Sequence, residues 1–220
     1  MQHTRLWEYF PTVMVPAVVV TIEIMLATAI LSIVFGVIIG TFLVLTDENG
    51  LMPRPVWHQI LNKITDIIRS FPSLILLVAL TPLTRIVIGT AIGPQAAIFA
   101  MTIGCTPFAA RMTENSLQQV DPAVIKAARS FGASTYQIVT KVMFIEALPT
   151  LASNFTILLI NMLNVSALAG AVGAGGLGAV ALTYGYQRFD YGIMYCVVVI
   201  LMLFVFFIQG MGTKLYKKWK

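Results

Sequence analysis

Residues 24–46 read IMLATAILSIVFGVIIGTFLVLT, a run of 23 residues without a charged side chain between Glu23 and Asp47. About 20 such residues in a helix cross the ~30 Å hydrocarbon core of a bilayer. The whole chain has this character, since 58% of its 220 residues are hydrophobic and 10% are charged, whereas soluble domains have about 45–50% and about 25%. The composition predicts an integral membrane protein and argues against a soluble enzyme, a nucleic-acid-binding domain or a disordered chain.

Other long uncharged runs predict further membrane-spanning helices. Glycine and proline end helices, so we expect the apolar stretch between Arg69 and Arg111 to break at 89–94, and the stretch 147–187 to break at the glycine-rich segment 170–178. We therefore predict an all-α integral membrane protein that forms a single transmembrane domain over 1–220, with five transmembrane helices. The predicted spans are 15–45, 64–88, 95–115, 148–169 and 191–213.

The distribution of basic residues predicts the orientation. With the N-terminus outside, 11 of the 14 Lys and Arg residues lie on the inner side, which is the asymmetry that the positive-inside rule describes. Arg5, Arg85 and Arg188 then lie outside, and the C-terminus, which includes Lys220, is cytoplasmic. The segment 116–146 becomes an inner loop and 170–187 an outer loop. The net charge of +5 thus indicates topology and attraction to anionic lipid headgroups, not nucleic-acid binding.

The inner loop contains helix start and stop signals. Asp121 followed by Pro122 is typical of an N-cap and a first helical residue, and Gly132 of the residue after a helix end, which predicts a short helix over 122–131. Ser134 and Gln137 have the spacing of a capping box that starts a second helix.

The first of these short helices has one apolar stripe, formed by Val124, Ala127, Ala128 and Phe131. The spacing of i, i+3, i+4 and i+7 places these side chains on one helix face. Such a helix suits docking into a groove of a partner protein, or lying on the membrane surface. The periodicity leaves both interpretations open.

Short motifs in and around the inner loop add a further signal. Lys126-Ala127-Ala128, followed by Gly132 and Val142, resembles the EAA loop of ABC-importer permeases, E-A-A-x3-G-x9-I-x-L-P. Lys126 stands where the family has glutamate, and Ile145 stands where it has the final proline. Further segments resemble the methionine-importer branch in order and spacing: Arg69-Ser70-Phe71-Pro72, Pro82-Leu83-Thr84-Arg85 with 89–93, Pro107-Phe108-Ala109-Ala110-Arg111 with Glu114-Asn115, Ile145-Glu146-Ala147-Leu148-Pro149, and 170–178.

The resemblance implies a type I ABC-importer permease fold and a set of partners. It implies a homodimer in a prokaryotic plasma (inner) membrane, two copies of a cytoplasmic P-loop ATPase that uses ATP and Mg, and an extracytoplasmic substrate-binding lipoprotein. The inner loop would form the coupling helices that enter a cleft of the ATPase. The residues that match this role are Asp121, Pro122, Lys126, Ala127, Ala128, Phe131 and Gly132.

The glycine-rich segment is the remaining conspicuous motif. Gly173, Gly175, Gly176 and Gly178 satisfy G-x-G-x-x-G, but a dinucleotide site requires a preceding strand and an acidic residue about 20 positions later. Here a transmembrane helix precedes the glycines, and Asp190 follows too soon. We expect a loop with left-handed turns and tight backbone packing, which the resemblance makes an outer surface where a binding protein docks.

Polar residues within the spans are few. Asn161 and Asn164 lie on one face of the fourth predicted span, with Leu168 next along it. This face could line a pathway with Leu168 as an apolar gate, or its residues could serve interhelical hydrogen bonding and packing. Gly36 and Gly40 in the first span form a small-xxx-small pattern, which favours general helix packing over a specific dimer contact.

The chain has no Walker A motif and no ionisable side chain in the middle of its neutral runs. ATP hydrolysis by this chain and an ion-coupled mechanism therefore lack support. We expect no catalytic residue, no metal site and no bound cofactor. The resemblance implies the permease subunit of an ATP-driven importer of an amino acid, with methionine as the implied substrate. The alternatives are another small solute, an ion-coupled secondary carrier, or a non-transporting membrane scaffold.

Overall fold

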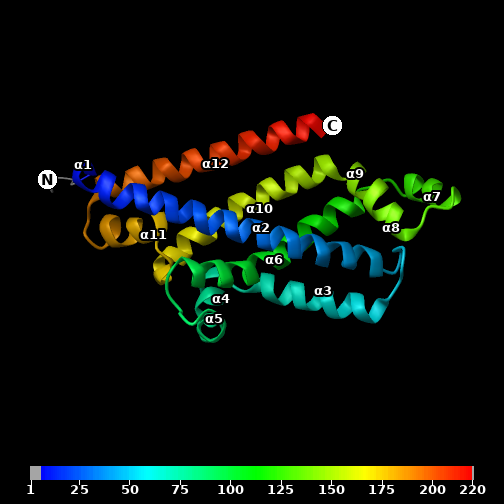
Figure 1. The fold of residues 1–220 in the computed structure, drawn as a ribbon, viewed down its shortest axis with the longest axis horizontal. Helices are drawn as coiled ribbons and strands as arrows, with labels where there is room; N and C mark the ends of the chain where they lie inside the picture. The colour runs from blue at the N-terminus through cyan, green and yellow to red at the C-terminus, as the bar shows by residue number, and fades with distance from the viewer. Residues whose placement is uncertain (1–5, 220) are drawn as a thin grey trace.

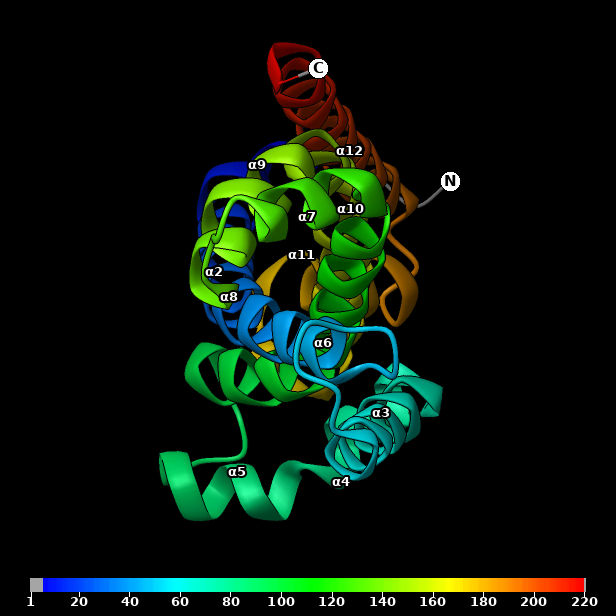
Figure 2. The same ribbon diagram turned by 90° about the vertical axis from the view of Figure 1, so that its right-hand side faces the viewer.

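A computed structural model of the chain describes residues 6–219, so that Arg5 and Lys220 of the charge count lie outside the described range. Between these limits all regular structure is helical and no strand occurs (Figures 1 and 2). The prediction of an all-α protein is confirmed.

The α-helices follow one another along an elongated bundle (Figure 1). They are α1 (Leu6–Tyr9), α2 (Val15–Thr46), α3 (Pro55–Ser70), α4 (Ser73–Ala79), α5 (Thr81–Ile88), α6 (Pro94–Gln118), α7 (Pro122–Ser130), α8 (Thr135–Gln137), α9 (Phe144–Glu146), α10 (Leu148–Ala169), α11 (Gly176–Val180) and α12 (Tyr191–Trp219). Wider π-helical turns connect several of them: η1 (Phe10–Met14), η2 (Ile138–Met143), η3 (Gly170–Ala174) and η4 (Ala181–Tyr186).

Three helical stretches of the described chain are long and apolar enough to cross a membrane: Phe10–Thr46, Leu148–Ala174 and Tyr191–Trp219. They coincide with the first, fourth and fifth predicted spans. Helix α6 has the position of the predicted span 95–115 but is less apolar than these three. Its role as a span, and the total of five, remain predictions.

The predicted span 64–88 is not one continuous helix. Helix α3 ends at Ser70, Phe71 and Pro72 are extended, and the chain resumes as α4 and then α5. Proline disfavours helical geometry in the residue before it, which explains the break at Phe71. Pro82 then lies in the first turn of α5, where its missing N–H costs nothing. Figure 2, in which α3 is seen nearly end-on, shows that α5 runs crosswise to α3 and lies to one side of it.

Helices α2 and α6 make the most extensive contact in the fold, and small residues allow it. A Cβ atom added to Gly36 would lie 2.9 Å from the Ala110 backbone nitrogen, and one added to Gly40 would lie 2.7 Å from the Thr113 Cβ. Both distances are too short for real atoms, so the two helices touch backbone to backbone. The small-xxx-small pattern therefore serves packing within the chain, as predicted.

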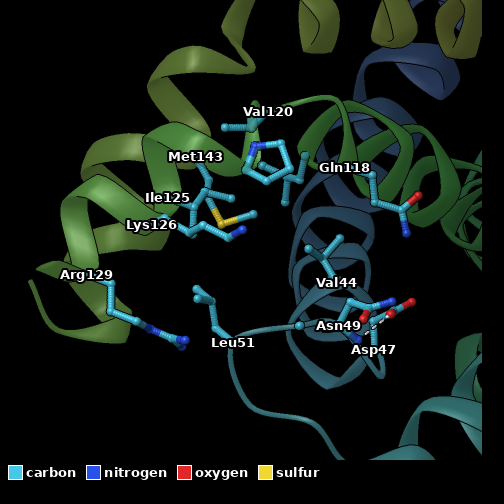
Figure 3. A pocket seen from close by; sticks show the side chains of 13 residues that line it. Val44, Asp47, Asn49, Leu51, Gln118, Val120, Ile125, Lys126, Arg129 and Met143 are labelled. Carbon is cyan, nitrogen blue, oxygen red and sulfur yellow. Dashed lines mark hydrogen bonds between the residues drawn. The ribbon is translucent and has the colours of Figure 1, made fainter.

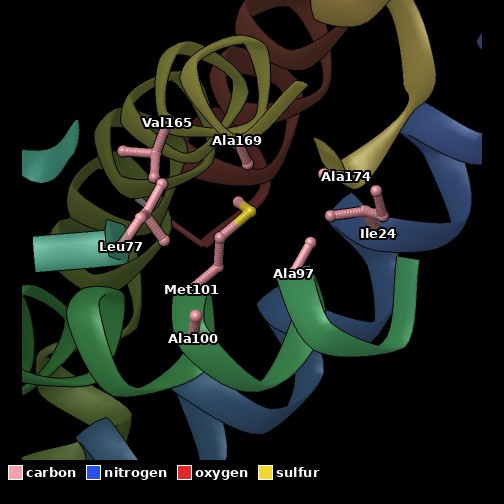
Figure 4. Close-up of a cluster of buried hydrophobic side chains, with 8 residues drawn as sticks. All are labelled: Ile24, Leu77, Ala97, Ala100, Met101, Val165, Ala169 and Ala174. Carbon is pink, nitrogen blue, oxygen red and sulfur yellow. The ribbon is translucent and has the colours of Figure 1, made fainter. Parts of the chain in front are cut away.

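A hydrophobic cluster brings four segments of the chain together around Met101 of α6 (Figure 4). Ile24 of α2, Leu77 of α4 and Val165 of α10 converge on it, and Ala174 closes it from the end of η3. Met101 is fully buried. The broken helix α3–α5 is thus fixed to the bundle through α4.

Replacing Gly40 with valine should destabilise the protein, because the new side chain has no space between α2 and α6. Overpacking of this kind costs about 1–3 kcal/mol. We expect a lower midpoint of thermal unfolding in detergent for G40V. The matched control is G210V, since a Cβ atom at Gly210 of α12 meets nothing within 4 Å. Equal unfolding midpoints for the two variants would contradict the packing described here.

Candidate functional site

Helix α7 is built by the local signals that the sequence contains. The Asp121 carboxylate accepts a hydrogen bond of 2.8 Å from the Ala123 backbone N–H, and Pro122 occupies the first turn. Gly132 has a φ of 79° and ends the helix. The next helix begins with the predicted capping box, in which Ser134 and Gln137 each accept a hydrogen bond from the other's backbone N–H. The predicted helix boundaries, 122–131 against Pro122–Ser130, are confirmed to within one residue.

One side of α7 rests on the protein body. Ile125 and Ala128 pack against a hydrophobic cluster that includes Leu117 of α6, Ile138 of η2 and Leu151 of α10. Ala128 of the predicted stripe is therefore an anchor of α7. Ile125, which lies outside the predicted stripe, is the second anchor.

The other side of α7 is exposed. Val124 and Ala127 face outward, and Phe131 has 91% of its surface exposed. Tyr136 on the following helix is 76% exposed. Large aromatic side chains are seldom left this bare unless a partner covers them. Val124, Ala127, Phe131 and Tyr136 thus form an exposed apolar surface at one end of the bundle, which we name the docking face (Figure 1).

A cavity of about 310 Å³ separates α7 from the loop after α2. Figure 3 shows Lys126 and Arg129 reaching into it from α7, while Asp47 lies on the opposite wall. Other residues of the wall are apolar and include Leu51 and Met143. The cavity leaves α7 in contact with the body along only part of its length, and its two cations give the α7 side a positive charge.

The predicted pathway residues lie on the face of α10 that turns away from α12. Asn164 and Leu168 are exposed, and Asn161 is half-buried. Asn161 borders a small cavity of about 70 Å³ together with Arg69 and Ser73. The sequence pattern places Arg69 at a helix end but does not bring it close to Asn161. The signal that could have indicated this proximity is Pro72, which breaks the helix between α3 and α4 just after Arg69.

Another polar residue of α10 has a structural role. The Asn154 amide donates hydrogen bonds to the Met112 carbonyl (3.3 Å) and the Ser116 hydroxyl (2.8 Å). Asn154 therefore makes interhelical hydrogen bonds to α6, which is the structural alternative that the sequence left open for polar residues of this helix.

A charged cluster joins α3 to α6 next to this region. The Arg111 guanidinium donates to Asp66 at 2.8 Å and to Glu114 at 2.6 Å, and also to the Asn62 side-chain carbonyl. Glu114 is buried, and its side chain is 5% exposed. A buried carboxylate is tolerable only beside such a partner. The i, i+3 spacing of Arg111 and Glu114 was visible in the sequence, but Asp66 is 45 positions away from Arg111.

The glycine-rich segment is more ordered than the predicted outer loop of 170–187. It forms η3, α11 and η4, of which α11 packs back against α2 and η4 against α12. The Leu177 backbone N–H donates to the Thr21 hydroxyl at 2.9 Å. Gly173, Gly175 and Gly176 have φ values of 96°, 81° and 72°, which confirms the predicted left-handed turns.

Gly178 serves close packing, which was also predicted. A Cβ atom at this position would lie 2.7 Å from the Ala167 Cα. The loop prediction failed because helical turns that begin after a glycine leave no periodic apolar pattern in so short a segment.

Among residues 6–219 no cluster of three or more His, Cys, Asp or Glu side chains could hold a metal ion. The site consists of a docking face at one end, a polar stripe on α10 and a tightly packed turn at the other end.

Comparison with known proteins agrees with this geometry. The MetI protein of Vibrio cholerae, named as a probable D-methionine transport system permease, is 42% identical over 83% of this chain and 81% of its own length. The Bacillus subtilis methionine import system permease protein MetP is 39% identical over 77% of each chain. A crystal form of the MetNI methionine ABC transporter in an inward-facing conformation superposes with a TM-score of 0.93, at 38% identity and over 94% of this chain and 96% of that one.

The family match covers most of the sequence. Residues 32–220 match the family described as the binding-protein-dependent transport system inner membrane component. By this match and by its relatives, the chain belongs to the inner-membrane permeases of binding-protein-dependent ABC transport systems.

Proposed function

We propose that this chain is the membrane-spanning subunit of an ATP-driven importer of methionine in the bacterial inner membrane. The observation that carries the proposal is the docking face, where a short capped helix presents Phe131 with 91% of its surface uncovered. An exposed aromatic residue on a rigid helix is typical of an anchor at a protein interface. The relatives named for methionine transport support the choice of substrate.

The partner on the docking face is a P-loop ATPase, which binds ATP and Mg, and each of two permease chains engages one ATPase. Lys126 and Arg129 are both exposed beside the docking face. We therefore expect acidic side chains in the ATPase groove that receives these two cations. A permease with the family glutamate at position 126 would need a different partner residue there. Closure of the ATPases on ATP would move α7 and shift the balance between inward-open and outward-open states.

The pathway lies between two copies of the chain. The α10 stripe of Asn161, Asn164 and Leu168 faces away from α12 and is largely uncovered in one copy. A second copy related by two-fold symmetry would enclose it. Leu168, 40% exposed near the end of α10, is suited to act as the apolar gate.

The glycine turn at the far end faces outward, with the N-terminus outside and the C-terminus in the cytoplasm. Gly173 is exposed there, and its backbone carbonyl accepts a 2.9 Å hydrogen bond from the Gly93 N–H at the start of α6. The extracytoplasmic binding protein would dock on this end and release methionine toward the α10 stripe.

Replacing Phe131 with alanine should weaken binding of the ATPase by at least about tenfold, because truncation of an aromatic anchor costs about 2 kcal/mol or more. Co-purification and titration of labelled ATPase measure this loss. Phe131 suits this test because its side chain is exposed, so its truncation leaves the contacts of α7 with the body through Ala128 and Ile125 in place.

The matched control for F131A is I86A, since Ile86 is 81% exposed on α5, away from α7. I86A should bind the ATPase as the unmodified chain does. Unchanged ATPase binding by F131A would remove the support for a coupling role and would favour the scaffold alternative.

Proteoliposomes that contain the chain, its ATPase and its binding protein should accumulate labelled methionine only when ATP is supplied. The L and D isomers are measured separately, and another amino acid at equal concentration serves as the control for specificity. Uptake by the chain alone under an ion gradient would establish the secondary-carrier alternative. ATP-dependent uptake of a different solute, without methionine, would retain the permease role and change the substrate.

A further inference from the structure

A second large cavity lies between α10 and α12, at the end of the bundle where the chain finishes. It has a volume of about 330 Å³ and lies beside Leu148, Phe155 and Leu159 on one wall and Ile208, Leu215 and Trp219 on the other. The Thr156 hydroxyl is the polar group on the α10 wall, and it donates to the Ala152 carbonyl at 2.7 Å. The cavity therefore presents hydrocarbon to whatever fills it.

This cavity forms a groove between α10 and α12, and the two helices touch at one small residue in its wall. A Cβ atom added to Gly212 would lie 2.6 Å from the Thr156 Cγ2. This contact fixes the spacing of α10 and α12 beside the groove, and both residues contribute to its wall.

The length of the groove corresponds to half of a bilayer. Its walls run from Leu148 to Leu159 and from Ile208 to Trp219, which is about 16 Å along each helix at 1.5 Å per residue. The hydrocarbon core of a bilayer is about 30 Å thick. The groove thus has about the length of one leaflet, and the part of its α12 wall after residue 213, where the predicted span 191–213 ends, reaches the level of the headgroups.

The groove faces away from the polar stripe of α10. Leu148, Phe155 and Leu159 follow one helix face, whereas Asn164 and Leu168 lie about half a turn away on the opposite face, as 3.6 residues per turn require. If two copies meet at the polar stripe, the groove is turned outward to lipid.

Basic side chains lie on the last turns of α12, the helix that forms one wall of the groove. Lys214, Lys217 and Lys218 are exposed at the end of α12, and none of the ion pairs in the described part of the chain includes them. Helices α9, α10 and α12 carry one acidic residue, Glu146. Lys214 and Lys218 are four residues apart and share the side of α12 next to Met211 of the groove wall, as 3.6 residues per turn require. By the same geometry Lys217 lies on the side of α12 opposite to the groove. The groove is therefore apolar, with two lysines along one edge and a tryptophan, a residue typical of the headgroup level, at its end.

We propose that this groove is a binding site for an anionic phospholipid, with one acyl chain between α10 and α12 and the headgroup phosphate held by Lys214 and Lys218. Basic clusters at the cytoplasmic end of a transmembrane helix attract anionic headgroups. The site depends on the membrane position of α12 and not on which solute the protein transports. A lipid wedged here would set the angle between α10, which carries the polar stripe, and α12.

Native mass spectrometry of the permease–ATPase complex, released from nanodiscs of phosphatidylglycerol and phosphatidylcholine with identical acyl chains, tests the proposal. We expect retained phosphatidylglycerol and little phosphatidylcholine. The double variant K214Q/K218Q should lower this retention by about tenfold, since each lysine near an anionic headgroup contributes about one tenfold step or less. K63Q, at an exposed lysine of α3, is the charge control and should retain lipid normally.

A second pair of variants separates the acyl chain from the headgroup. L148W fills the groove and should expel the lipid with the lysines intact, whereas L26W adds the same bulk at an exposed site on α2 and should not. Inorganic phosphate at millimolar concentration should fail to compete, because it lacks the acyl chain. Equal retention of both phospholipids, or retention unchanged in K214Q/K218Q and in L148W, would overturn the proposal.

A cross-linking experiment tests the competing occupant, a second copy of the chain. M211C in a C196S background places one thiol at the groove, apart from the buried Cys105. The lipid site predicts no disulfide between copies at this position. Efficient cross-linking would show that protein covers the groove and would also overturn the proposal.

Discussion

The close approach of α2 and α6 at Gly36 and Gly40 is the constraint on which the other contacts depend. Apolar side chains gain little by exchanging lipid for protein, so close packing and polar contacts must hold helices together in a membrane. Once α6 lies against α2, it presents Met101 to the central hydrophobic cluster and Arg111 to Asp66 of α3. The end of α6 also leads directly into Asp121, so the position of α7 follows from the same contact.

The parts of the site that local sequence determines could be predicted. Asp121, Gly132 and the Ser134–Gln137 box each act on backbone groups within a few residues, and the structure has all of them. The long apolar helices could also be predicted, because an uncharged run of sufficient length has few alternatives to spanning a bilayer. The exposed side of α7 followed from periodicity, except that Ala128 of the predicted stripe packs against the body together with Ile125.

Features that depend on distant residues or on short segments could not be predicted. The partners of Arg111 include Asn62 and Asp66, and no pattern links positions so far apart. The helix break at Phe71 and Pro72 lies within an apolar run, and this run predicted one continuous span over 64–88 despite the proline. In the outer segment the spacing of glycines predicted the turns, but the packing of Leu177 against Thr21 depends on α2.

Helix α12 packs mainly on α10 and η4, and 11% of its most apolar window is buried. The ribosome makes α12 after α2, α6 and α10, so α12 can join a surface that these earlier helices form with one another. Folding of the α2–α6–α10 core therefore does not have to wait for α12, which forms an outer layer between that core and the lipid.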